Sequence, residues 1–296
     1  MTRSLTLYCK SYRTDLKRAI RLAKSIRQFN AEKIPFYLSA PAVDVPLFKE
    51  HLANFDVEVI ADDLILQQNP RLNIDRMKSL PGSITQQVIK SEFWRLGLSN
   101  VYVCLDSDAV FIRPFYQSDF LWENDLPYTV MDEGHELLEA SLSPGKPQVV
   151  RNFFHEAADV QNRFDRIGKA FAFGPFPVLW HKSVWTSLET QYLTPRGMNL
   201  LDAILLAPLE SRWYGEALLR YQAIPLMPCQ PLFKVYHYAW QLDQDQRAHL
   251  GLDQLAQLYS GVIYQSAWER EMDWPREGGT WQSRIARRLR RRLGRT

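Results

Sequence analysis

Short apolar runs alternate with amphipathic segments along the first 105 residues of this 296-residue chain. The apolar runs predict strands at residues 4–9, 33–41, 57–63 and 101–105. The segments between them predict helices at residues 15–29, 45–55 and 84–98, with Ser83 as a cap and Gly97 near an end. This alternation is typical of an α/β fold, in which a mainly parallel sheet is flanked by helices. In such sheets ligands bind at the carboxyl ends of the strands.

The second half is less regular. Residues 123–134 predict a strand with an acidic loop, and residues 174–189 predict a Pro-rich approach to a helix. Residues 210–221 predict a helix, and residues 231–241 predict an aromatic strand or loop. We expect one catalytic body over residues 1–245, a helical extension over 246–282 and an Arg-rich tail over 283–296.

The composition favours a globular protein, because 46% of the residues are apolar and 23% are charged. Three cysteines, Cys9, Cys104 and Cys229, lie far apart with no CxxC pair, so neither a disulfide framework nor a zinc site is indicated. The chain starts with no signal-peptide pattern and contains no run of eighteen apolar residues. We therefore expect a cytoplasmic protein.

The C-terminal tail accounts for the net positive charge, because the rest of the chain has 29 basic and 33 acidic side chains. Its sequence RIARRLRRRLGRT contains seven arginines and no acidic residue, although the whole chain has a net charge of only +3. Ile285, Leu289 and Leu293 recur at four-residue steps, which as a helix would give an apolar stripe among arginines. Such a segment indicates an anchor on an anionic membrane surface. A disordered, solvated tail is the alternative. Nucleic-acid binding is disfavoured, since no nucleic-acid motif is present in the body.

Two aspartates follow the fourth predicted strand, in VYVCLDSDAVFIRP. In an extended segment Asp106 and Asp108 share a face and lie roughly 6–7 Å apart. Two carboxylates at that distance repel each other unless a cation lies between them. Mg²⁺ and Mn²⁺ prefer oxygen ligands, so the pair predicts a site for a metal–diphosphate complex. The alternative is two solvated acids at the end of a strand.

This region resembles the DxD motif of glycosyltransferases that use nucleotide sugars and have the GT-A fold. The preceding stretch, ITQQVIKSEFWRLGLSNVYVCLDSD, is similar to a QQxxK helix and DSD strand found in a bacterial glycosyltransferase-like family, DUF6492. Four further blocks are similar to that family and occur in its order, one near the start of the chain and three after the DSD strand: YCKSYRTDL, PVLWHKSVW, ESRWYGEALL and VYHYAWQ. The resemblance covers residues 4–241 and implies a GT-A-type, Rossmann-like sheet.

The resemblance also implies a metal site. Asp108 would be the main ligand of Mn²⁺ or Mg²⁺, and Asp106 would contact the donor ribose or a metal-bound water. His237 would approach the same ion from the far end of the chain. The ion would offset the charge of the departing diphosphate as a Lewis acid. Without the resemblance, a histidine among aromatic residues is more often part of a core.

Further donor contacts are expected on the helix before the DxD motif. Gln87, Lys90 and Trp94 share one helical face, so Lys90 could reach the donor phosphates or sugar. A solvated helix face is the alternative. The resemblance places the base and ribose of the donor beside residues after the first and third strands: Tyr8, Lys10, Ser11, Tyr12, Asp62 and Asp63.

An inverting transferase needs a general base for the acceptor hydroxyl. Glu210 is the first candidate and Glu216 the second, with Arg212 close enough to keep either carboxylate ionised. An ordinary surface Glu–Arg pair is the alternative, and a retaining enzyme would need no such base. Three residues are expected to line the acceptor or donor-sugar pocket: Pro177, Trp180 and His181.

The favoured function is metal-dependent sugar transfer to a glycan or lipid-linked acceptor in bacterial surface polysaccharide synthesis, at the inner face of the membrane. A UDP-sugar is the favoured donor, and GDP- and dTDP-sugars stay open. One alternative is a haloacid-dehalogenase-type phosphatase with Asp106 as nucleophile and Asp108 as acid/base, but that motif normally follows a first strand. Another is a non-catalytic module that binds nucleotide sugars.

Overall fold

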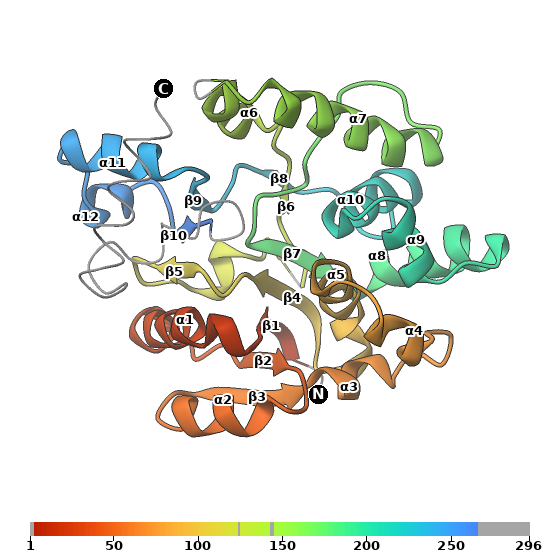
Figure 1. The fold of residues 1–296 in the computed structure, drawn as a ribbon, viewed down its shortest axis with the longest axis horizontal. Coiled ribbons are helices and arrows are strands. Elements are labelled where there is room, and N and C mark those ends of the chain that lie inside the picture. The colour runs from red at the N-terminus through yellow and green to blue at the C-terminus, as the bar shows by residue number, and fades with distance from the viewer. Residues whose placement is uncertain (1–2, 124, 143–144, 266–296) are drawn as a thin grey trace.

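The computed structural model describes residues 3–123, 125–142 and 145–265 (Figure 1). The Arg-rich tail and residues 266–282 of the expected extension lie outside these residues, and so does the predicted amphipathic stripe of Ile285, Leu289 and Leu293. No helix within the described ranges is long and apolar enough to cross a membrane.

A five-stranded sheet forms the centre of the fold. Its order is β3 (Val57–Ala61), β2 (Phe36–Ala40), β1 (Arg3–Lys10), β4 (Ser99–Leu105) and β7 (Val178–His181). The first four strands run parallel and β7 runs antiparallel to β4. The prediction of a mainly parallel α/β sheet is confirmed. The strand order reverses at β1, which lies between β2 and β4, so the carboxyl ends of β1 and β4 form the switch point where ligands bind in such folds.

Helices cover both faces of the sheet, because alternate side chains of each strand point to opposite faces. Tyr8, Tyr102 and Cys104 belong to one core cluster, and Leu7 and Leu105 belong to the other. Figure 1 shows the corresponding layers, with α1 (Leu16–Phe29) and α2 (Val45–Leu52) on one side and α5 (Gly82–Glu92) on the other. The remaining helices are α3 (Asp62–Leu66), α4 (Ile74–Lys78), α6 (His135–Leu142), α7 (Pro147–Arg163), α8 (Lys182–Ser187), α9 (Leu200–Leu206), α10 (Glu210–Tyr221), α11 (Ala239–Arg247) and α12 (Leu252–Leu255).

A second sheet joins the end of the described chain to the DxD segment. Its order is β5 (Ala109–Phe111), β10 (Gly261–Tyr264) and β9 (Phe233–Tyr236). Strand β10 is antiparallel to β5 and parallel to β9. A helical extension was expected from residue 246, whereas β10 is the middle strand of this sheet. Residues 246–265 therefore pack as part of the body. A short pair, β6 (Thr129–Val130) and β8 (Pro228–Cys229), completes the strands.

The residues predicted to begin and end elements near α5 were partly confirmed. Gly97 ends the following 3-10 turn with φ +65°, as its lack of a side chain allows. Ser83 is not the cap, because Pro81 takes that position and α5 begins at Gly82. Asp62 and Asp63 begin α3 instead of ending a strand, which suits acidic side chains at a helix N-terminus.

Candidate active site

The carboxyl ends of β1, β3 and β4 meet at one edge of the central sheet, as their polar ends predicted. Lys10 ends β1, and its Nζ lies 3.0 Å from Oδ2 of Asp62, which follows β3. Asp106 follows β4, and its Oδ1 lies 2.6 Å from Nζ of Lys90 on α5. The structure therefore brings four of the predicted donor residues together at this edge as two ion pairs, which we call the donor edge.

Lys90 is buried at the centre of the donor edge. Its side chain is 5% exposed, while that of Asp106 is 28% exposed. Burial alone would lower the pKa of Lys90, but the carboxylates of Asp106 and Glu210 outweigh it and raise the pKa above its usual value. The ammonium also lies 4.2 Å from the ring centre of Phe176. Lys90 is thus a fixed, charged group between two carboxylates and an aromatic face.

Glu210, the first candidate base, begins α10 and is buried. Burial raises its pKa, and the charge of Lys90 partly offsets that rise. The expected neighbour, Arg212, points elsewhere: it donates to the carbonyl of Phe153 at 3.0 Å, with its guanidinium 4.6 Å from the Phe153 ring centre. Burial lowers the pKa of Arg212 to about 10. The group that faces Glu210 is therefore Lys90.

Glu216, the second candidate base, accepts two hydrogen bonds from Arg166, at 2.5 Å from Nε and 2.7 Å from Nη2. Its side chain is only 3% exposed. Both oxygens are engaged by a bidentate guanidinium, a geometry that favours the ionised and immobile carboxylate. The arrangement supports a structural part for Glu216, holding the segment after α7 against α10.

The residues expected at the donor base and ribose divide into buried and accessible ones. Tyr8 is fully buried, with its ring 3.8 Å from that of Phe93 and its hydroxyl 2.8 Å from Oγ of Ser39, so it supports the edge from beneath. Tyr12 is 45% exposed. Within the described residues, Ser11 Oγ and Asp62 Oδ1 of this set are buried without a hydrogen-bond partner, and so is Oε1 of Gln87 on α5. Because buried polar atoms are nearly always paired, these are places where a ligand's polar groups would be stabilised.

The three predicted metal ligands have suitable chemistry. Asp106 and Asp108 offer carboxylates, and burial lowers the pKa of His237 to about 4, which keeps its imidazole in the neutral, ligating form near pH 7. The geometry is less favourable. Strand β10 lies between β5, which Asp108 precedes, and β9, which His237 follows, so the backbones of these two residues are about 9–10 Å apart. Across the described ranges no three His, Cys, Asp or Glu side chains are gathered as a metal site, and Lys90 supplies the cation beside Asp106.

The expected pocket residues of the PVLWHK block lie mostly in the core. Trp180 is 1% exposed, and its ring packs against those of Tyr102 and Trp185, with centroids 5.6 and 5.1 Å away. His181 caps α8 by accepting from the backbone N–H of Ser183 at 3.0 Å. Phe176, which precedes Pro177, lines the pocket described next.

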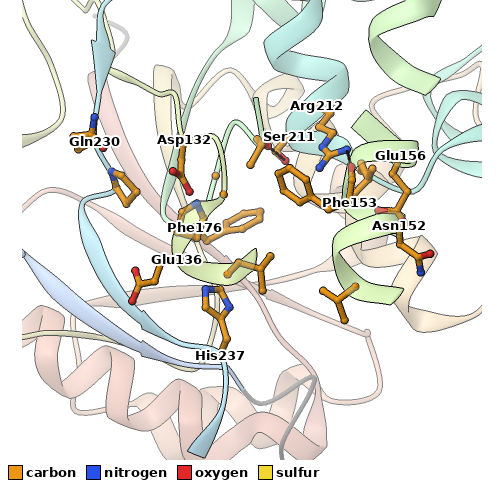
Figure 2. A pocket seen from close by; sticks show the side chains of 18 of the residues that line it. Asp132, Glu136, Asn152, Phe153, Glu156, Phe176, Ser211, Arg212, Gln230 and His237 are labelled. Carbon is orange, nitrogen blue, oxygen red and sulfur yellow. Dashed lines mark hydrogen bonds between the residues drawn. The ribbon is translucent and has the colours of Figure 1, made fainter. Parts of the chain in front are cut away.

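A pocket of about 780 Å³ adjoins the donor edge (Figure 2). We call it the α6–α7 pocket, since those helices form one wall and the 172–176 loop, the start of α10 and His237 form the others. Its volume falls in the range of small-molecule sites. The side chains on which its chemistry depends are Asp132, Glu136, Leu137, Val149, Phe153, Glu156, Phe176, Arg212 and His237.

Asp132 is the pocket residue that sequence reasoning missed. It follows β6 within the acidic loop predicted at 123–134, but nothing in the sequence set it apart from Glu133 beside it. The helices of the pocket wall also went unassigned. A signal was present in α7, where Phe153, Ala157 and Val160 are buried at helical spacing.

Comparisons with known proteins address the fold and the family. The mouse xyloside xylosyltransferase 1 structure aligns with a TM-score of 0.47 and 7% identity, covering 89% of this chain and 98% of that one. The bifunctional glycosyltransferase WbbM aligns with a TM-score of 0.48 and 9% identity, covering 90% of this chain and 46% of that one. No curated protein matches this chain. The family model of DUF6492, a family of unknown function, matches residues 3–247, and the chain belongs to that family.

Proposed function

We propose that this protein is a glycosyltransferase of the GT-A class that moves a sugar from a nucleoside diphosphate sugar to a glycan or lipid-linked acceptor. A UDP-sugar is the favoured donor, and the synthesis of bacterial surface polysaccharide is the proposed context. The observation that carries the proposal is the donor edge, where two buried lysines and two aspartates meet at the switch point of a parallel sheet.

The orphaned polar atoms at this edge suit the uncharged part of a nucleotide. Ser11 Oγ can donate a hydrogen bond, while Asp62 Oδ1 and Gln87 Oε1 can accept one. A ribose or base offers both kinds of partner. Tyr12, which is exposed next to Ser11, adds an aromatic surface against which a base can pack. These contacts support the assignment of the ends of β1 and β3 to the nucleoside.

Lys90 and Asp106 are proposed to handle the diphosphate and the sugar. The ammonium is held in place before any ligand arrives, so its charge needs little reorganisation when negative charge develops on the departing phosphate. Glu210 and Asp106 keep that ammonium charged despite its burial. We therefore propose that Glu210 acts mainly through Lys90. Glu210 as the base of an inverting reaction stays a prediction.

A divalent ion, Mn²⁺ or Mg²⁺, is part of the proposal, with Asp106, Asp108 and His237 as its ligands. When bound there, the ion would supply Lewis-acid stabilisation of the diphosphate. The oxygen and nitrogen ligands that these three side chains offer support this assignment. A binding experiment has to test whether residues beside β5 and β9, which are separated by β10, can reach the same ion. Metal titration followed by tryptophan fluorescence measures this directly.

The test of the proposed function is a thermal-shift screen of nucleotides and nucleotide sugars with Mn²⁺. A ligand that binds the folded state raises the melting temperature according to its affinity. We expect a UDP-sugar to do so in the wild type, and Asp108→Ala to lower transfer about 100-fold with the fold retained. Asp75→Ala, at a side chain that is 93% exposed on α4, is the matched control. Metal-dependent cleavage of p-nitrophenyl phosphate without nucleotide binding would favour the phosphatase instead.

The Arg-rich tail is proposed to bind an anionic membrane surface, on the strength of its sequence alone. Truncation after Gln282 should then release the protein from liposomes that contain phosphatidylglycerol. Neutral liposomes are the control, and sedimentation that truncation leaves unchanged would contradict this part of the proposal.

A further inference from the structure

We propose that the α6–α7 pocket binds the acceptor, an uncharged glycoside with an apolar aglycone, and that Asp132 is the base that takes the proton from its hydroxyl. This inference rests on the proposed glycosyltransferase function. It assigns a binding site and a catalytic residue to a part of the chain that the DxD motif and the donor edge do not include.

Asp132 is held so that its carboxyl faces the pocket. Its backbone carbonyl accepts a hydrogen bond from the N–H of Ala172 at 2.8 Å, and the backbone N–H groups of Gly134 and Glu133 partly offset the rise that burial causes in the pKa of its carboxyl. Gly134 has φ +77°, and a Cβ there would lie 2.7 Å from the Phe153 ring, so the loop packs directly on α7. Figure 2 shows the Asp132 carboxyl directed toward the interior of the pocket, above Phe176.

The other carboxylates of the pocket are matched by cations. Glu136 forms an ion pair with Lys234, and Glu156 lies near enough to Arg212 to favour its charged form. Within the described residues no lysine or arginine forms an ion pair with Asp132. Burial raises the pKa of Asp132, which brings it closer to the value that suits a general base near neutral pH. Asp132 is therefore the carboxylate best placed to accept a proton from a ligand.

The walls of the pocket indicate the kind of acceptor. Leu137, Val149 and Phe153 form an apolar surface on the side of α6 and α7, suited to an aromatic or aliphatic aglycone. Arg212, which with His237 supplies the basic side chains among the described lining residues, donates to the Phe153 carbonyl and lies near Glu156. An anionic acceptor would meet uncompensated negative charge at Asp132, so an uncharged glycoside is favoured.

The pocket shares a wall with the donor edge, which brings acceptor and donor together. Phe176 lines the pocket and also packs against Lys90, 4.2 Å from its ring centre. His237 lines the pocket from the second sheet, where Tyr264 N donates to the carbonyl of Asp108 at 3.2 Å. A hydroxyl beside Asp132 and Phe176 therefore lies next to the side of the site where the donor sugar is proposed to be.

The hydroxyl oxygen of the acceptor forms a bond to the anomeric carbon of the donor sugar, and the O–H proton passes to Asp132. The bond between the anomeric carbon and the phosphate oxygen breaks, and its electron pair leaves with the nucleoside diphosphate. No oxidant or reductant is required.

Binding is tested first, with p-nitrophenyl hexosides as probes and saturation-transfer NMR as the readout. We expect the wild type to bind at least one of them, and Leu137→Trp, which fills the pocket, to weaken binding at least tenfold. Leu142→Trp is the matched control, because Leu142 lies on the same helix, is 56% exposed and does not line the pocket. Asp132→Asn should weaken binding less than tenfold. Absence of glycoside binding, or equal binding by Leu137→Trp, would overturn the proposal.

Proton transfer is tested with Asp132→Asn and Asp132→Ala in the full chain, using UDP-sugar and p-nitrophenyl hexoside. We expect kcat to fall about 100- to 10,000-fold, with UDP-sugar affinity unchanged within threefold. Added formate should restore part of the rate of Asp132→Ala but not of Asp108→Ala. Glu139→Gln, an exposed carboxylate on the same helix as Leu137, is the charge-matched control.

The outcomes separate this inference from the proposed function. An Asp132→Asn enzyme that transfers sugar within threefold of the wild-type rate overturns the role of Asp132, while glycosyl transfer itself stands. A wild type that binds the glycoside in a Leu137→Trp-sensitive manner but binds no nucleotide sugar overturns the proposed function and, with it, the base role, leaving the glycoside site.

Discussion

The donor edge and the α6–α7 pocket differ in how the protein handles charge. At the donor edge each buried lysine is matched to an aspartate, Lys10 to Asp62 and Lys90 to Asp106. In the pocket the walls are mostly apolar, and Asp132 faces the interior with no ion pair to a lysine or arginine of the described chain. The donor edge is thus built to hold charge in fixed positions, whereas the pocket selects by shape and leaves one acid available to a ligand.

The two lysine–aspartate pairs differ in a similar way. The side chains of Lys10 and Asp62 are 6% and 10% exposed, so both partners are closed off. In the other pair Lys90 is 5% exposed but Asp106 is 28% exposed. One pair therefore closes the base of the site, while the other presents a carboxylate at its surface with a buried cation behind it.

The comparison predicts that the largest loss of stability comes from the cation of the donor edge. Lys90→Met leaves Asp106 and Glu210 without the charge between them, so we expect the free energy of unfolding to fall by about 3–5 kcal/mol. Urea unfolding measures it. Lys78→Met, whose partner Asp75 is 93% exposed, should change stability by less than about 1 kcal/mol. Equal losses in the two variants would show that the Lys90 pair is not a buried ion pair in solution.

A smaller effect on stability is expected from His237, which lines the α6–α7 pocket on the side of the second sheet. The pKa of His237 is about 4 in the folded protein and about 6.5 when unfolded, so the unfolded state binds more protons between these values. The stability that depends on neutral His237 is fully present above pH 6.5 and is lost as the pH falls toward 4. Between pH 7 and pH 5 the free energy of unfolding should therefore fall in both proteins, but by about 2 kcal/mol less in His237→Phe than in the wild type.

Urea unfolding at both pH values gives that difference, and His51→Phe reports the effect of losing an exposed histidine. Parallel pH dependence in the wild type and in His237→Phe would contradict the burial of His237 as a neutral group.

The smallest effect is expected from packing behind the pocket. A Cβ on Gly215 in α10 would lie 2.1 Å from Cγ of Phe173, so Gly215→Ala must displace the loop that carries Phe176. We expect a net loss of about 1–2 kcal/mol, because overpacking exceeds the gain in helix propensity. Gly82→Ala, where nothing lies within 4 Å, should be neutral or stabilising. A Gly215→Ala variant as stable as Gly82→Ala would show that the loop moves freely.

The meeting of polar residues at the donor edge was predictable from the sequence because it follows from the alternation of strands and helices. Strands that alternate with helices align parallel, so residues that follow β1, β3 and β4 reach one edge whatever the details of the loops. The pairing of Lys90 with Asp106 was not predicted, since it depends on how deeply α5 packs against β1 and β4. Trp180 was misplaced because its segment was expected to be a Pro-rich approach to a helix, whereas it forms β7 and its ring is buried in the core.

The pocket could not be predicted because its parts are far apart and irregular. Asp132 follows a two-residue strand, and its position depends on contacts with Ala172 and with Phe153 on α7. Likewise, residues 261–264 carry no signal that sets them in the second sheet, since their partners come from positions 109–111 and 233–236. Only the tertiary fold brings these segments together.

The pairing of β10 beside the DxD segment has a mechanical consequence for the tail that follows it. Gln265 N donates to the carbonyl of Tyr236, so the last described residue lies beside the residue that precedes His237. A polypeptide spans at most about 3.4 Å per residue, so Arg284 lies no more than about 65 Å of chain from that point. A tail bound to a membrane would then tether the catalytic edge itself, and a lipid-linked acceptor in that membrane would be present at a raised effective concentration.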